Sequence, residues 1–271
     1  MDYAASIGHF DTVNWLHQNR TEGCTKFAMN EAAENGHFNI VKYLHENRTE
    51  GCTQIAMDYA AKNGHLEIVK YLSENRTEGC SQNAMDYAAI YGQFEVIKWL
   101  SENRTKGCMT HAMNVAAYRG YFDIVKYIHF NRTGGCTTRA MDNAAGEGHL
   151  HIVQWLHENH TEGCTASAMA AAANSGHLST INWLHENRSE KWKSCTIENA
   201  AAHGDIDVIK YLHEKFGTAC SQKALKNAIK NTHKKVVKYI LDNQSTTSQV
   251  DDIQLHGKIE GCQLKRPFDE I

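Results

Sequence analysis

Cysteine residues recur along the 271-residue chain at a spacing that could support disulfide or metal chemistry. Six of the nine cysteines stand 28 residues apart, at Cys24, Cys52, Cys80, Cys108, Cys136 and Cys164. Equivalent atoms in stacked repeats lie about 8–10 Å apart, whereas a disulfide needs Cα atoms within about 7 Å and zinc holds its sulfur ligands at about 2.3 Å. We therefore expect reduced cysteines that pack as small buried residues, without a disulfide framework.

Histidine residues form two further columns at the same period. One column is His9, His37, His65, His149, His177 and His233, and the other is His17, His45, His129, His157, His185 and His213. Repetition favours a structural role, because catalysis needs one distinctive residue with an orienting partner. The densest group is His149, His151, His157 and His160 with Cys164, and because it is spread around a helix and its exit we expect no metal site there. The sequence also has no glycine-rich phosphate loop, nucleophile elbow or zinc-protease helix, so we expect no cofactor, no catalytic residue and no enzymatic activity.

Asparagine followed two residues later by threonine or serine recurs as well, which in a secreted protein would predict glycosylation. The sequence enters its first repeat without the basic segment and apolar core of a signal peptide, so we expect a different role. Asparagine is second to glycine at the left-handed position that ends a helix. We therefore interpret these residues as helix C-caps: Asn19, Asn47, Asn75, Asn103, Asn131, Asn159, Asn187 and Asn243.

All of these columns belong to one repeat of 28 residues. Its units begin at Met1, Met29, Met57, Met85, Met113, Met141, Met169, Ile197 and Leu225. In the ninth unit Thr232 replaces the turn glycine and lysines accumulate, so we interpret this unit as the C-terminal cap of an array that spans residues 1–243. Residues 244–271 are polar and show no repeat, and we expect them to form a loosely ordered tail.

The third unit, residues 57–84, shows how one repeat is expected to fold. Its methionine and two adjacent alanines lie on one side of a first helix. Thr53 can cap the start of this helix, and Gly64 can end it in the left-handed conformation. A second helix, residues 66–74, has apolar residues over more than half of its circumference, which is typical of a helix packed on both sides. The sequence therefore predicts an all-α helical-repeat solenoid.

The segment AAKNGHLEIVKYL, residues 60–72, resembles the ankyrin repeat. The residues that carry the resemblance are Ala60, Ala61, Gly64, His65, Leu66, Ile68, Val69 and Leu72. The opening Ala56-Met57-Asp58 replaces the family's Thr-Pro-Leu-His, and the period is 28 residues instead of about 33. The resemblance covers residues 1–243 and implies a protein-binding array with reduced or absent β-hairpin fingers. Its short form with NRTEGC connections looks like arrays common in protists and in the large DNA viruses that infect them.

The formal net charge of -3 is small, so the protein has no strong electrostatic field of one sign that would indicate binding to nucleic acid or to a membrane surface. The apolar stretches are too short to cross a bilayer. An odd number of dispersed cysteines suits a reducing compartment. We therefore expect an intracellular monomer in the cytoplasm or nucleus, or in the host cytoplasm if the protein is viral.

Columns that differ between units mark where a protein partner of unknown identity could bind, because the constant columns serve packing and turns. The variable columns lie on the exposed side of the first helix, and the resemblance implies that this side lines a concave binding surface. The predicted partner-binding residues are Tyr59, Lys62, Tyr87, Ile90, Tyr91, His111, Tyr118, Arg119, Tyr121 and Arg139. Tyrosine and arginine are enriched at interface hot spots. The alternative hypothesis is a nucleic-acid or anionic-partner site at Lys226, Lys230, Lys234 and Lys235, which salt dependence would distinguish.

Overall fold

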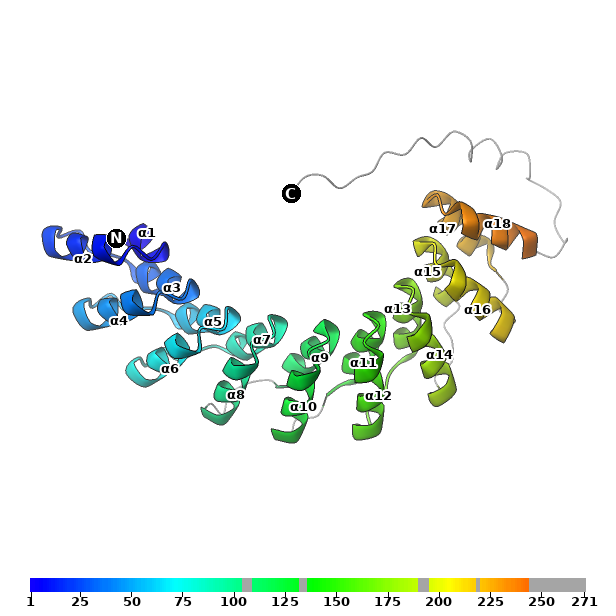
Figure 1. The fold of residues 1–271 in the computed structure, drawn as a ribbon, viewed down its shortest axis with the longest axis horizontal. Coiled ribbons are helices and arrows are strands. Elements are labelled where there is room, and N and C mark those ends of the chain that lie inside the picture. The colour runs from blue at the N-terminus through cyan, green and yellow to red at the C-terminus, as the bar shows by residue number, and fades with distance from the viewer. Residues whose placement is uncertain (104–108, 132–135, 190–194, 218–219, 244–271) are drawn as a thin grey trace. The chain divides into compact units, whose positions relative to one another are not determined.

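The computed structural model describes residues 1–103, 109–131, 136–189, 195–217 and 220–243 (Figure 1). These residues form eighteen α-helices and contain no strand, so the predicted fold class, an all-α helical-repeat solenoid, is confirmed. The expected tail, residues 244–271, lies outside the described residues. None of the described helices is long and apolar enough to span a membrane.

Each repeat contributes a first and a second helix joined by a short turn. The first helices are α1 (Asp2–Ser6), α3 (Lys26–Glu34), α5 (Gln54–Lys62), α7 (Asn83–Ile90), α9 (Met109–Arg119), α11 (Thr138–Gly146), α13 (Ala166–Asn174), α15 (Cys195–His203) and α17 (Gln222–Lys230). The second helices are α2 (Phe10–Asn19), α4 (Phe38–Asn47), α6 (Leu66–Asn75), α8 (Phe94–Asn103), α10 (Phe122–Asn131), α12 (Leu150–Asn159), α14 (Leu178–Asn187), α16 (Ile206–Phe216) and α18 (Lys234–Asn243). The sequence period is therefore the period of a helical hairpin.

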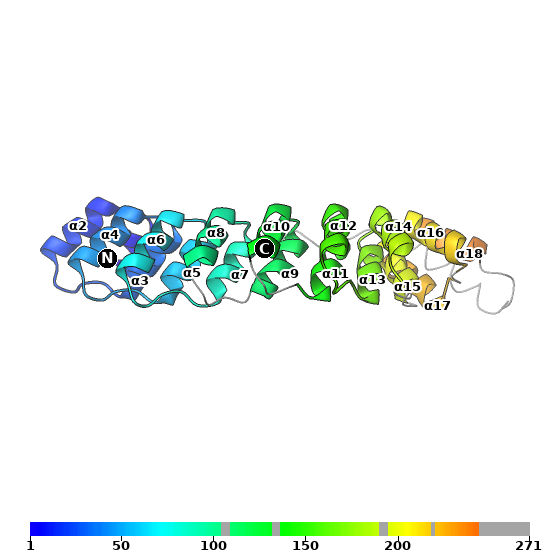
Figure 2. The same cartoon turned by 90° about the horizontal axis from the view of Figure 1, so that it is seen from below.

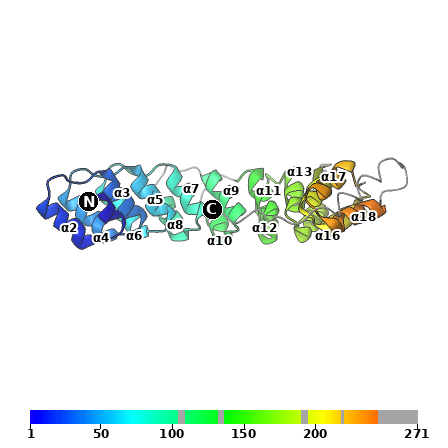
Figure 3. The ribbon, with the colours of Figure 1, turned by 90° about the horizontal axis from the view of Figure 1, so that it is seen from above.

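The helices group into two compact units. The first unit comprises Met1–Ala140 and Leu156–Gly163. Within it α1, α3, α5, α7 and α9 pack side by side in a first-helix row, while α2, α4, α6, α8 and α10 form a second-helix row (Figure 2 and Figure 3). The second unit comprises Met141–Trp155 and the described part of Cys164–Ile271. There α13, α15 and α17 pack in one row and α16 packs against α18.

Small residues on the first helices and branched residues on the second helices build the core. Ala60 and Ala61 of α5 are completely buried, which allows neighbouring first helices to approach closely. Ile68, Val69 and Leu72 of α6 are buried as well. Burying a branched apolar side chain such as Ile68 or Leu72 contributes about 1.5–3 kcal/mol relative to leaving it exposed. Each hairpin therefore depends on its neighbours for its apolar core.

The turn between the two helices confirms the role predicted for its glycine and histidine. Gly64 follows α5 with a φ of 79°, in the left-handed region. The His65 N–H then donates to the Ala60 carbonyl at 2.9 Å, and the His65 ring Nε2 lies 3.1 Å from the Glu34 carbonyl of the preceding repeat. A Cβ atom on Gly36 would meet this same ring. The turn histidine is therefore a packing and hydrogen-bonding link between repeats.

The predicted N-cap is confirmed, and the structure adds a link between repeats at the same position. The Thr53 hydroxyl accepts a hydrogen bond from the N–H two residues further on, at 3.3 Å. In the next repeat the Ser81 hydroxyl donates to Asp58 Oδ2 at 2.6 Å, and its N–H donates to Asp58 Oδ1 at 2.9 Å. Asp142 holds Thr165 in the same way. The residue after the methionine column therefore fixes the helix start of the following repeat.

The prediction that the asparagine column forms left-handed C-caps is wrong. Thr232 is the one non-glycine residue with a positive φ in the described part of the chain. Asn75 is instead the last residue of α6, and its side-chain amide donates to the Tyr71 carbonyl at 2.9 Å. Arg76 then continues in an extended conformation with a φ of -130°. The amide satisfies a carbonyl at the helix end without any strained backbone, and the same bond forms at Asn47.

Candidate protein-binding surface

Three tyrosines and a lysine form an aromatic cluster on α5 and α7. The ring centroids of Tyr59 and Tyr87 lie 6.0 Å apart, with the rings tilted by 55°. Lys62 Nζ lies 5.1 Å from the Tyr59 centroid and 5.6 Å from the Tyr91 centroid. The same ammonium group lies 3.5 Å from Glu34 Oε1. Because cation–π and ion-pair contacts restrain Lys62 between the rings, the cluster is ordered before any partner arrives.

The surface continues onto α9 and its turn. Tyr91 is 50% exposed and Tyr118 is 43% exposed, which is high for large aromatic residues. Arg119 is exposed too, and its guanidinium carbon lies 5.6 Å from the Tyr118 ring centroid. Ile90, beside Tyr91, is half-buried. The structure therefore brings together an aromatic and cationic surface from three consecutive first helices.

The remaining predicted residues lie in other positions. His111 and Arg139 are exposed near the starts of α9 and α11. Tyr121 is half-buried in the turn that precedes α10, and a Cβ atom on Gly92 would meet its ring. Tyr121 therefore takes the place of the turn histidines, and its packing role sets it apart from the exposed tyrosines.

The connections between repeats contain a repeated ion pair. The Arg48 guanidinium donates to both carboxylate oxygens of Glu50, and Glu50 also accepts from the Cys24 N–H at 3.4 Å. The hydrogen bonds from Arg48 lower the pKa of Glu50 to about 2. Arg76 and Glu78 form the same pair one repeat later. This network explains why the Asn-Arg-Thr-Glu-Gly-Cys segment varies so little.

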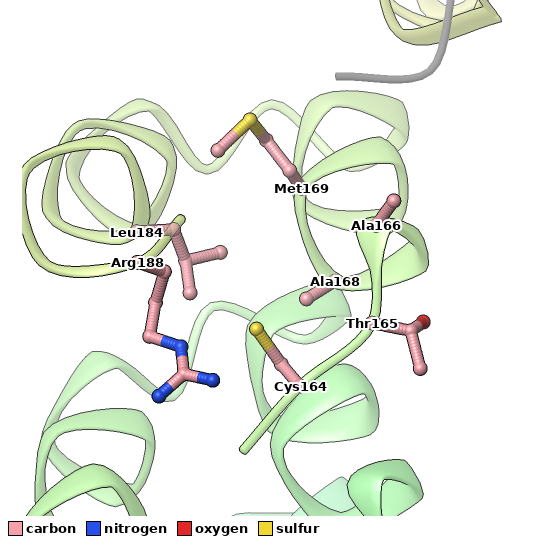
Figure 4. Close-up of a pocket in the computed structure, with 7 residues that line it drawn as sticks. All are labelled: Cys164, Thr165, Ala166, Ala168, Met169, Leu184 and Arg188. Carbon is pink, nitrogen blue, oxygen red and sulfur yellow. The ribbon is translucent and has the colours of Figure 1, made fainter. Parts of the chain in front are cut away.

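Figure 4 shows an arginine beside a cysteine in the second unit. Cys164 and Arg188 line a small pocket there, together with Met169 and Leu184. Cys164 belongs to the cysteine column, and Arg188 belongs to the arginine column of the following connection. Among the described cysteines of this column, Cys52, Cys136 and Cys164 are buried as expected, whereas Cys24 and Cys80 are half-buried. Cys24 and Cys52 lie near Arg48 and Arg76 of the next connection in the same way.

His160 replaces the arginine in one connection of the first unit. Ligand atoms of Cys136, His160 and Glu162 all lie within 4.8 Å of one another. Burial, with a contribution from the Glu162 charge, raises the pKa of Cys136 to about 11. Burial and the nearby His129 lower the pKa of His160, although Glu162 opposes that shift. We did not predict this group from the sequence, although a histidine in the arginine column is a signal that points to it.

The lysines of the alternative hypothesis lie on the last two helices. Lys226 and Lys230 are exposed on α17, and Lys234 and Lys235 are exposed at the start of α18. A further lysine of this region, Lys223, pairs with Glu198 through a 2.7 Å contact. The four lysines therefore offer a cationic surface, but they lie outside the aromatic cluster.

Rows of helical hairpins with a variable exposed face define a helical-repeat protein of the solenoid class. Two family descriptions match the chain. "Ankyrin repeats (3 copies)" matches residues 1–86, 50–112 and 168–252, and "Ankyrin repeats (many copies)" matches residues 113–157. The chain belongs to the ankyrin repeat family, whose repeats are general protein–protein interaction modules. No curated protein matches the chain in a sequence comparison.

Proposed function

We propose that the chain is a non-enzymatic scaffold that binds a partner protein on the first-helix row, across α5, α7 and α9. One observation carries this proposal. Of the nine large apolar residues that are exposed in the described part of the chain, six belong to first helices or to the residues that cap them: Tyr3, Ile7, Phe27, Ile55, Tyr91 and Tyr118. A row of exposed apolar side chains on one face is typical of an interaction surface.

The composition of the aromatic cluster supports the same face. Tyrosine and arginine dominate interface hot spots, and truncating one such residue commonly costs more than 1 kcal/mol of binding free energy. Lys62 contacts the rings of Tyr59 and Tyr91, and Tyr59 contacts Tyr87. These contacts restrain the side chains, so little side-chain entropy is lost when a partner covers them. We infer that Tyr91 and Tyr118, the most exposed aromatic residues of this group, contribute most of the affinity.

The test is affinity capture with a Tyr91→Ala, Tyr118→Ala double variant, using extract from the cells that make the protein. A protein retained by the wild-type chain should bind at least about tenfold more weakly to the variant. Phe130→Ala is the matched control, because Phe130 is 71% exposed but lies on the second helix α10. Helicity and thermal melting should be unchanged in all three proteins. Equal retention by the double variant and the wild type would refute the proposed face.

The lysine surface at the last two helices supports the alternative function, binding of nucleic acid or another anionic partner. Lys226, Lys230, Lys234 and Lys235 are exposed, and phosphate contacts by lysine weaken steeply as salt rises. Neutralising Lys230, Lys234 and Lys235 together should abolish such binding while the tyrosine variants retain it. Partner binding that survives high salt and the lysine substitutions would exclude this alternative.

A further inference from the structure

The connection after α12 differs from its neighbours at one chemically decisive position. In the other connections between residues 1 and 188 the residue after the helix-ending asparagine is an arginine. At Arg48 and Arg76 its positive charge balances Glu50 and Glu78. At the sixth connection this residue is His160. A neutral imidazole does not carry the positive charge of a guanidinium. In this connection the residue beside Glu162 and the buried Cys136 is therefore an imidazole instead of a guanidinium.

The three side chains offer ligand atoms at close range. Cys136 Sγ, a ring nitrogen of His160 and a carboxylate oxygen of Glu162 lie within 4.8 Å of one another. His160 Nδ1 is 3.5 Å from Glu162 Oε2, so this nitrogen faces the carboxylate. The side chain of His160 is only 8% exposed, and that of Glu162 is 35% exposed. The group is therefore partly shielded from solvent but can be reached through Glu162.

A second histidine fixes the orientation of the first. His160 Nε2 lies 3.0 Å from His129 Nδ1, and the two ring centroids are 4.6 Å apart. In the tautomer of His160 that carries its proton on Nε2, this N–H donates a hydrogen bond to His129 Nδ1. The Nδ1 atom of His160 then presents its lone pair toward Cys136 and Glu162. A partner on the remote ring nitrogen is the usual way in which a metal-binding histidine is oriented.

We propose that Cys136, His160 and Glu162 bind a divalent transition-metal ion of the zinc class, with His129 as a positioning residue. Thiolate, imidazole and carboxylate are all zinc ligands, and a thiolate disfavours calcium and magnesium. Zinc bond lengths place tetrahedral ligand atoms about 3.3–3.8 Å apart. His160 Nδ1 already lies 3.5 Å from Glu162 Oε2, and the three ligand atoms, all within 4.8 Å of one another, need to contract only slightly around the ion. The Cys136 thiol proton is released to solvent as the ion binds. The ion then supplies the positive charge that arginine provides in the other connections.

The test is a Co²⁺ titration of the tag-free, reduced full-length chain, followed by competition with Zn²⁺. A thiolate-to-cobalt charge-transfer absorption should appear, saturate at one ion per chain and disappear when zinc displaces cobalt. Cys136→Ser should remove the absorption. His160→Arg should remove it too, and since this change restores the residue of the neighbouring connections, the variant should keep its fold.

Matched variants separate this site from its arginine-containing equivalents. Cys52→Ser should leave the absorption unchanged, because Arg76 is the residue that reaches Cys52. Glu162→Gln should weaken binding, and His129→Phe, which keeps a packed ring but removes the acceptor, should weaken it by about 10–100-fold. An absorption that survives Cys136→Ser, or a folded His160→Arg protein that binds cobalt as tightly as the wild type, would overturn the proposal. So would a wild-type chain that shows no absorption.

Discussion

Replacing Met109 by threonine is expected to stabilise the array. Met109 stands in the column of Thr53 and Ser81, where a hydroxyl group caps the first helix. The Ser81 hydroxyl also donates to Asp58 of the preceding repeat. The aspartate at this step is Asp86, and its Oδ1 atom is buried without a hydrogen-bond partner among the described residues. Burial also raises the pKa of Asp86, although His111 opposes that shift. A methionine side chain has no hydroxyl group with which to cap a helix or to donate to Asp86.

The size of the effect follows from the two bonds that the hydroxyl would form. A side-chain N-cap contributes about 1 kcal/mol, and a hydrogen bond to a charged group contributes about 1.5–3 kcal/mol. Asp86 is only partly buried, so we take the lower value for the bond and expect Met109→Thr to raise the unfolding free energy by about 2.5 kcal/mol. Urea denaturation should show a higher midpoint with an unchanged slope.

Two controls isolate the hydroxyl group. Met109→Val has the shape of the threonine variant but no hydroxyl, so it should not raise the midpoint. In an Asp86→Ala background, Met109→Thr should retain only the cap, about 1 kcal/mol of the gain. A threonine variant no more stable than the valine variant would refute this reasoning. The same gain with and without Asp86 would show that the aspartate does not take part.

Three further predictions concern the turns and connections. Glu50→Gln should cost about 1 kcal/mol at neutral pH. Because the folded pKa is lowered from 4.5 to about 2, the difference from wild type should be complete above pH 4.5 and vanish as the pH falls through 2 in acid melts. Thr232→Gly should raise the urea midpoint by the equivalent of about 1 kcal/mol, since Thr232 has a φ of 62°. Gly64→Ala should lower stability by about 1–2 kcal/mol because its φ is 79°; an unchanged midpoint in either variant would contradict the assigned strain.

Much of the fold could be predicted from the sequence because every repeat shows the same pattern of packing and turn residues. The alanine pair, Gly64 and His65 recur at one period, and their roles in packing and in the turn are local. The asparagine prediction failed because two mechanisms can end a helix at the same residue. A side-chain hydrogen bond, as from Asn75 to the Tyr71 carbonyl, and a left-handed backbone conformation both favour asparagine at the end of a helix. The backbone dihedral angles distinguish the two mechanisms.

The contacts between repeats were harder to predict. The spacing between equivalent cysteines says nothing about their contacts with other columns, whereas the structure places Cys136 and Cys164 near the arginine column of the next connection. Likewise, variability alone grouped Tyr121 with Tyr91, although Tyr121 lies against Gly92 in the turn. Residues that meet across repeats are separated by about one period in the chain. Their pairing depends on the helix register, which hydrophobic periodicity does not specify.

Site-specific photo-crosslinking tests the central proposal, partner binding on the first-helix row, most directly. A photoreactive phenylalanine analogue replaces Tyr91 or Tyr118 in one pair of proteins and Lys70 or Lys98, exposed on the second helices α6 and α8, in another. Each protein is irradiated in extract from the cells that make it. We expect the same discrete protein adduct from positions 91 and 118 and none from positions 70 and 98. An adduct confined to the second-helix positions would contradict the proposal.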